Sequence, residues 1–136
     1  MKSTIVKYTN GLLMLFVHFG AIYFVFERVS ARLKPEDQLS IVMILAPLTA
    51  TFVSLFLKDA VRHARRQGEP EKDDFTAAFA IITVLITVLY GATIFFILQN
   101  YLSNTDIGPD MLKLYVGVIE TVIGGFVGIL YAELFK

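Results

Sequence analysis

The sequence predicts an all-α integral membrane protein in which four helices form an up-down-up-down bundle. Hydrophobic residues make up 56% of the 136 residues, charged residues only 18%, and the mean hydropathy is +0.67. An ordinary soluble domain is less apolar than this. The apolar residues also fall into four stretches separated by polar breaks, and three of these stretches reach the length of about 20 residues that a helix needs to cross a bilayer.

We expect spans at approximately residues 7–28, 38–58, 74–99 and 112–134, and a single domain over residues 1–136. The first apolar stretch is short and becomes long enough only if the helix starts near Lys7 and ends at Glu27 and Arg28. A cleaved signal peptide is the other interpretation of this stretch, but no small-residue cleavage site follows it directly.

Proline, glycine and acidic residues mark the expected starts of the later helices. Pro35 is followed by Glu36 and Asp37, and Gly108 and Pro109 precede the fourth span. Proline is tolerated in the first turn of a helix, and carboxylates are favoured near its positive end. The connections between spans are too short for a soluble domain.

The distribution of basic residues predicts that both termini lie in the cytoplasm, since Lys and Arg near helix ends are retained on that side. Eight of the twelve basic residues fall on the side of the termini and of the 58–74 loop, namely Lys2, Lys7, Lys58, Arg62, Arg65, Arg66, Lys72 and Lys136. The other four are Arg28, Arg32, Lys34 and Lys113. We expect a bacterial inner (plasma) membrane as the location.

The two helical hairpins are candidates for tandem repeats. Residues 19–21 (Phe-Gly-Ala) match residues 90–92 (Tyr-Gly-Ala) at a shift of 71. Two copies of a two-span unit point the same way and are expected to be related by an axis along the membrane normal.

Small residues at a spacing of four form faces that let helices approach closely, which favours packing within the bundle or association of subunits. We expect these roles for two sets of residues: Gly117, Gly124, Gly125 and Gly128 in the fourth span, and Ala46, Ala50 and Ser54 in the second. Thr83, Thr87 and Gly91 form a similar stripe in the third span. We therefore expect a homo-oligomer.

Glu120 and His18 are the titratable groups deep within the spans, and we take them as candidates for an ion or proton pathway. A charged carboxylate in a bilayer costs about 2.5 to 3.5 kcal/mol on insertion scales, so Glu120 has to be paired, hydrated or protonated. At about 1.5 Å per residue, His18 lies about 16 Å above Lys7 and Glu120 about 21 Å above Leu134. Because the first and fourth helices are expected to be neighbours, the two side chains can meet. Each also has a purely structural interpretation, as a hydrogen-bonded helix contact.

Pro47 in the second span predicts a static kink or a hinge. The loop of residues 58–74 is basic first and acidic afterwards. Lys58, Arg62 and Arg66, together with Arg65, are expected to anchor the protein to anionic lipid or to bind a cytoplasmic protein.

Several functions are disfavoured. The net charge of zero gives no argument for nucleic acid, and the absence of cysteine excludes disulfides and thiolate metal sites. No histidine pair at ligand spacing, phosphate-binding loop or nucleophile elbow is present. We expect neither an enzyme nor a bound metal or cofactor.

Three functions remain open. The first is an oligomeric membrane protein that forms or gates an ion or proton pathway. The second is a non-conducting adaptor, sensor or immunity-type subunit, for example in toxin neutralisation or phage defence. The third is a small proton-coupled transporter, since four spans with one membrane carboxylate can suffice for exchange.

Overall fold

The computed structural model describes residues 3–65 and 77–135, and within these residues every regular element is helical. In chain order the elements are α1 (Ser3–Glu27), η1 (Val29–Arg32), α2 (Pro35–Arg65), α3 (Ala77–Ser103), α4 (Pro109–Ile119), η2 (Glu120–Gly124) and α5 (Gly125–Leu134). Here η1 is a short 3₁₀ helix, and η2 is a π-helical turn that interrupts the last span. Four segments are long and apolar enough to cross a membrane: Ile5–Glu27, Pro35–Arg62, Ala77–Ser103 and Pro109–Leu134. The prediction of an all-α membrane protein with four spans is confirmed.

The expected start signals mark real helix starts. Helix α2 begins at Pro35 with Glu36 and Asp37 in its first turn, and α4 begins at Pro109 directly after Gly108. In both helices the proline occupies a position whose backbone N–H would have no partner within the helix.

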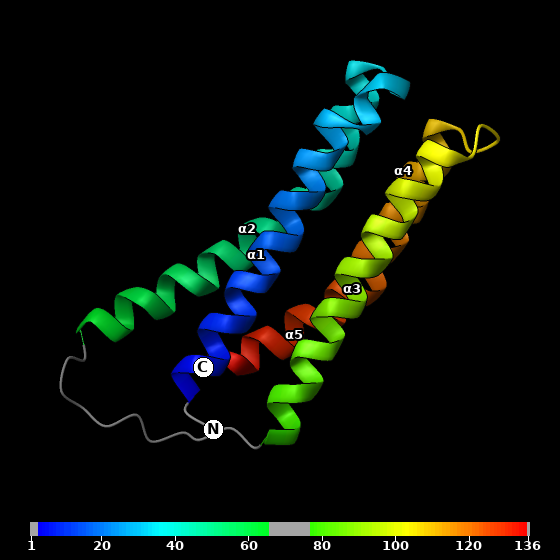
Figure 1. Cartoon of the computed structure of the whole chain (residues 1–136). Coiled ribbons are helices and arrows are strands. Elements are labelled where there is room, and N and C mark those ends of the chain that lie inside the picture. The colour runs from blue at the N-terminus through cyan, green and yellow to red at the C-terminus, as the bar shows by residue number, and fades with distance from the viewer. Residues whose placement is uncertain (1–2, 66–76, 136) are drawn as a thin grey trace.

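The bundle consists of two antiparallel hairpins that lie side by side (Figure 1). One hairpin is α1 with α2, the other is α3 with α4, and the first turn of α1 and the last turn of α5 lie at the same end of the bundle. The most extensive contacts between hairpins join α1 to α3 and α2 to α4. Helices α1 and α4 therefore occupy opposite corners, so the prediction that the first and fourth spans are neighbours is wrong for α4. The end of the fourth span, α5, does reach α1, since the Tyr131 hydroxyl donates to the backbone oxygen of Asn10.

The same arrangement bears on the expected repeat. A two-fold axis along the membrane normal would place α1 and α3 at opposite corners, whereas these helices are packed against each other. The hairpins point the same way, but they are related by a sideways displacement and not by that axis.

Two helices change direction at the same level of the bundle. The green end of α2 turns away from the line of its first half, and α5, in red, turns away from α4 and runs toward the start of α1 (Figure 1). Pro47 lies inside α2, where it lacks the N–H of a regular helical hydrogen bond. In the last span the change of direction coincides with the π-helical turn η2. The predicted kink at Pro47 is present.

The outward surface is apolar, as lipid contact requires. Phe16 is 74% exposed, Phe96 70% and Ile129 67%. The interior is also apolar over most of its length, with Met14, Leu45 and Ile94 among its buried residues.

Ion pairs and hydrogen bonds join the helices at both ends of the bundle. Lys7 of α1 pairs with Asp59 of α2 at 3.8 Å, and at the opposite end Lys113 of α4 pairs with Asp37 of α2 at 2.7 Å. Beside the latter pair, the Arg32 guanidinium donates to the backbone carbonyl oxygens of residues 101 and 104. Helix α2 is thus held near both of its ends.

Candidate functional site

Three polar side chains from three different helices meet in the apolar interior and form the candidate site. His18 comes from α1, Tyr90 from α3 and Glu120 from the first position of η2. The Tyr90 hydroxyl lies 3.0 Å from His18 Nε2 and donates a hydrogen bond to Glu120 Oε1. The three residues are 1%, 0% and 9% exposed. They therefore form one continuous hydrogen-bonded chain that is shielded from solvent and lipid, and we call it the triad.

Helical periodicity brings His18 and Tyr90 into the interior. His18 follows Asn10 and Met14 at intervals of four residues, and all three are buried along one face of α1. Tyr90 follows Thr83 and Thr87 on the buried face of α3. Residues three or four positions apart share one side of a helix, so these two faces run along the bundle interior.

The π-helical turn positions Glu120. Its side chain is buried, and so is Gly124, the last residue of the turn. A Cβ atom at Gly124 would lie 2.5 Å from Leu48 Cδ2 of α2 and 3.5 Å from Glu120 Oε2. Leu48 of α2 therefore fills the space beside residue 124 that a side chain would otherwise occupy.

The hydrogen bonds of His18 limit which atoms of the triad can carry protons. His18 Nδ1 lies 3.0 Å from the carbonyl oxygen of Met14, which can only accept, so Nδ1 carries a proton and donates it. The phenol of Tyr90 has a single proton and two neighbours. If Tyr90 donates to Glu120, then His18 Nε2 has to donate to the Tyr90 oxygen, and the pair is imidazolium and carboxylate.

A second proton arrangement satisfies the same two contacts. In that arrangement protonated Glu120 donates to the Tyr90 oxygen, and Tyr90 donates to neutral His18 at Nε2. Both arrangements have no net charge and place one proton in each hydrogen bond. They differ only by the concerted movement of two protons along the chain, so the triad can pass a proton between α1 and the last span without creating a net charge in the membrane interior.

The second oxygen of Glu120 remains without a hydrogen-bond partner among the described residues. This oxygen faces Gly124, since a Cβ there would approach it to 3.5 Å. A buried acceptor without a partner is costly, and such groups in native structures are often functional. The unpaired Oε2 leaves the Glu120 carboxyl group able to accept or release a proton on the side that faces Gly124.

A second polar cluster lies nearer the chain termini, and an aromatic side chain contacts both this cluster and the triad. In that cluster, the Tyr131 hydroxyl donates to the backbone oxygen of Asn10 at 2.7 Å and lies 3.1 Å from Thr87 Oγ1. The Phe52 ring of α2 lies 5.2 Å from the His18 ring and 4.9 Å from the Tyr131 ring, measured between centroids. Phe52 thus packs against one ring of each polar cluster.

The structure brings His18 and Glu120 into one site, but not by the direct contact that the sequence suggested. Because α1 and α4 are diagonal, the two groups are joined through Tyr90. Sequence reasoning missed Tyr90 as a site residue. The available signal was a phenol far from both ends of an apolar span, where its hydroxyl needs a polar partner.

The predicted packing residues fall into two groups. Gly124 and Gly128 lie against Leu48 of the same chain. In contrast, a Cβ atom at Gly117 or Gly125 would meet nothing within 4 Å. The stripe of α2 is likewise exposed at Ala46, Ala50 and Ser54. Gly124 and Gly128 therefore serve packing within the bundle, and an oligomeric role for the outward residues stays a prediction.

The predicted basic stripe is described only in part. Helix α2 continues to Arg65, with Lys58 exposed and Arg62 half-buried. The side chain of Arg65, and all of Arg66 and the acidic part of the 58–74 loop, lie outside the described residues. A role of this stripe in lipid or partner binding stays a prediction.

Within residues 3–65 and 77–135, no group of three or more His, Cys, Asp or Glu side chains is arranged to hold a metal ion. The fold and the site together define the class: a four-span membrane protein with a buried polar chain across three helices. Compared with protein-family models, with curated proteins and with solved structures, the chain matches none of them.

Proposed function

We propose that the protein forms or gates a pathway for protons across the membrane, with the triad as the site that carries them. The observation that carries this proposal is the continuous hydrogen-bonded chain from His18 through Tyr90 to Glu120 in the apolar interior. Buried ionisable groups in a membrane interior are costly and commonly mark proton relays. The two neutral proton arrangements of the triad supply a mechanism for transfer.

The chemistry of the triad favours protons over metal cations. The Tyr90 hydroxyl, His18 Nε2 and Glu120 Oε1 are already paired with one another, and each of the two contacts needs one proton. A metal cation would have to break these hydrogen bonds and would find few oxygen ligands, whereas hard cations take six or more. A proton instead fits into the existing chain.

The pathway requires access to the buried triad from both sides, and we propose that a rearrangement of the bundle within a homo-oligomer opens this access. A four-helix subunit fills its own centre with side chains. The outward small residues Gly117 and Gly125 would allow the last span of one subunit to approach another closely. From the distribution of basic residues, we further propose cytoplasmic termini and a location in a bacterial inner membrane.

The test is proton flux into liposomes that contain the purified protein, with the mass of the complex measured in nanodiscs on the same sample. We expect a closed oligomer and a flux that Glu120→Gln abolishes, since the amide cannot release a proton. Glu27→Gln is the matched control, because Glu27 is exposed at the end of α1. A silent wild-type protein, or full flux in Glu120→Gln, would contradict the proposal.

A further inference from the structure

Two phenylalanine rings pack against α1 on the side of the triad that leads to the first turn of this helix. They belong to Phe56 of α2 and to Phe135, which directly follows α5. A Cβ atom at Gly11 would lie 2.7 Å from Phe56 Cδ2 and 3.1 Å from Phe135 Cζ, so both rings occupy the space that a side chain would need. At about 1.5 Å per residue, His18 lies about 10 Å further along α1.

Two further rings connect this pair to the triad. The Tyr131 ring lies 6.0 Å from the Phe135 ring and 4.9 Å from the Phe52 ring, and the Phe52 ring lies 5.2 Å from the His18 ring, all between centroids. Phe52, Tyr131 and Phe135 are buried, and Phe56 is half-buried. We call these four rings the aromatic plug. An apolar constriction excludes water, and without water a proton has no route past the plug.

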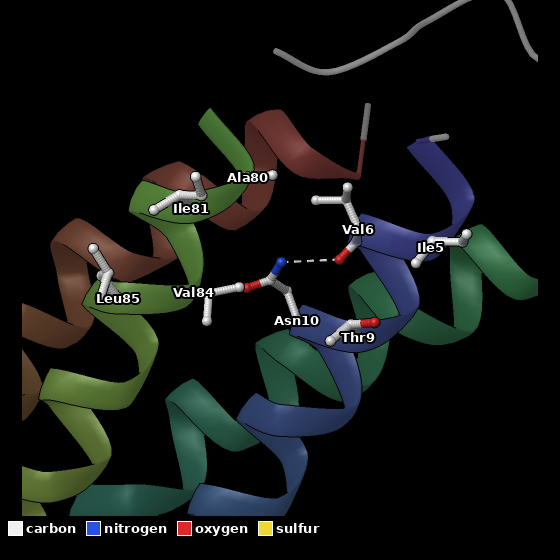
Figure 2. Close-up of a pocket in the computed structure, with 8 residues that line it drawn as sticks. All are labelled: Ile5, Val6, Thr9, Asn10, Ala80, Ile81, Val84 and Leu85. Carbon is white, nitrogen blue, oxygen red and sulfur yellow. Dashed lines mark hydrogen bonds between the residues drawn. The ribbon is translucent and has the colours of Figure 1, made fainter. Parts of the chain in front are cut away.

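The space between α1 and α3 beside the plug is closed to water in the same way. A pocket of about 240 Å³ lies there, with Val6, Asn10 and Val84 among its lining residues. Asn10 Nδ2 donates to the carbonyl oxygen of Val6 at 2.9 Å, and Figure 2 shows the side-chain oxygen of Asn10 pointing toward Val84. Because Asn10 is fully buried, the pocket offers water no polar route to the triad.

The plug consists of side chains from the two segments that change direction in the bundle (Figure 1). Phe52 and Phe56 follow Pro47 in α2, whereas Tyr131 and Phe135 follow the π-helical turn η2. Helix α2 is held to α1 and to α4 by ion pairs near its two ends. A movement of α5 leaves both of these ion pairs intact, so α5 is the part of the plug that is suited to move.

The junction between η2 and α5 has the properties of a hinge. It contains three glycines, Gly124, Gly125 and Gly128. Glycine weakens a helix because it loses more conformational freedom on folding than other residues do. π-Helical turns are rare and occur frequently at functional sites. Glu120 is the first residue of this turn, so a movement at the junction acts directly on the triad.

We propose that α5 is a gate, which swings about η2, withdraws Tyr131 and Phe135 from the plug and admits water to the triad from the end of the bundle that holds the first turn of α1. In the closed position, the Tyr131 hydroxyl donates to the backbone oxygen of Asn10 at 2.7 Å and lies 3.1 Å from Thr87 Oγ1. These two contacts hold α5 against α1 and α3. The inference rests on the proposed proton pathway and supplies its access on one side.

The first test measures whether a water-soluble reagent reaches a position that Tyr131 covers. Thr87→Cys places a thiol at a fully buried site, and the chain has no cysteine of its own. With the plug intact, a charged methanethiosulfonate reagent on both sides of a liposome membrane should react slowly with this thiol. Phe135→Ala should increase the rate several-fold. Phe126→Ala is the matched control and should leave the rate unchanged, because Phe126 is 64% exposed on the outside of α5.

The second test separates a moving gate from a fixed barrier. Tyr131→Phe keeps the ring but removes the hydroxyl that holds α5, so both the labelling of Thr87→Cys and the proton flux should increase several-fold. Adding Glu120→Gln should abolish the increase in flux and keep the increase in labelling. Unchanged labelling in both Phe135→Ala and Tyr131→Phe would overturn the gate. If labelling follows the expectation but no variant conducts protons, the gate is supported and the proton pathway is contradicted.

Discussion

Replacing Tyr90 with phenylalanine removes one oxygen atom from the centre of the triad. That oxygen lies 3.0 Å from His18 Nε2 and donates to Glu120 Oε1, so both contacts disappear while the ring keeps its place in the α3 interface. The ring also packs on the His18 ring at 5.4 Å between centroids, and this contact is retained. The substitution therefore separates hydrogen bonding from packing.

The expected cost in stability follows from the two lost hydrogen bonds. Hydrogen bonds between helices within a bilayer contribute about 0.6 kcal/mol each on average, which gives a loss of about 1 kcal/mol. The loss increases toward about 1 to 3 kcal/mol for each group that is left buried without a partner. For proton flux the effect is larger, because no oxygen remains between His18 and Glu120. We expect a fall of roughly a hundredfold, at the lower end of what a positioned proton-transfer group contributes.

The assay is proton influx into liposomes driven by a potassium diffusion potential, with flux normalised to the amount of inserted protein. Tyr23→Phe is the matched control, because Tyr23 is 66% exposed on the outside of α1 and the chemical change is identical. Unchanged flux in Tyr90→Phe, with unchanged stability in denaturant, would refute the relay. An equal loss in Tyr23→Phe would show that the effect is unrelated to the triad.

Two further predictions concern the packing around the triad. Gly91→Ala places a Cβ atom 2.8 Å from Val17 Cγ2, and because a valine side chain is stiff, we expect a loss of about 1 to 3 kcal/mol in unfolding experiments. Val17→Ala should recover the lost stability, whereas Gly108→Ala, with open space at its Cβ, should cause no loss. Phe52→Ala removes the ring that packs against both the His18 ring and the Tyr131 ring. We expect this substitution to raise the proton leak in the same liposomes. An unchanged leak would show that Phe52 is no barrier.

The number, type and approximate limits of the spans could be predicted from sequence because hydrophobicity alone determines them. Pro35 and Pro109 start helices because their chemistry acts locally, within one turn. The spatial order of the helices could not be predicted in this way. Hydropathy is nearly the same on several faces of these helices, so it does not specify which pairs of helices are adjacent.

The candidate site could be predicted only in part for the same reason. His18 and Glu120 are recognisable because a titratable group is conspicuous in an apolar span. Tyr90 is not, since a tyrosine in a span also fits a core or an interfacial position. The π-helical turn at Glu120 could not be predicted from the sequence either, because it depends on the register of the backbone hydrogen bonds and not on composition.

The contacts of helix α2 indicate whether the bend at Pro47 is static or acts as a hinge. Its first turn is held to α4 through Asp37 and Lys113, and its far end is held to α1 through Asp59 and Lys7. Between these two points, Leu48 lies against Gly124 of the last span. A change in the bend would therefore move Leu48 against the turn that carries Glu120, or break one of the ion pairs. The pair of Lys7 and Asp59 has side chains only 12% and 11% exposed, so separating it requires that water reach both charges. These constraints favour a static kink, in which Leu48 of α2 lies against the turn that carries Glu120.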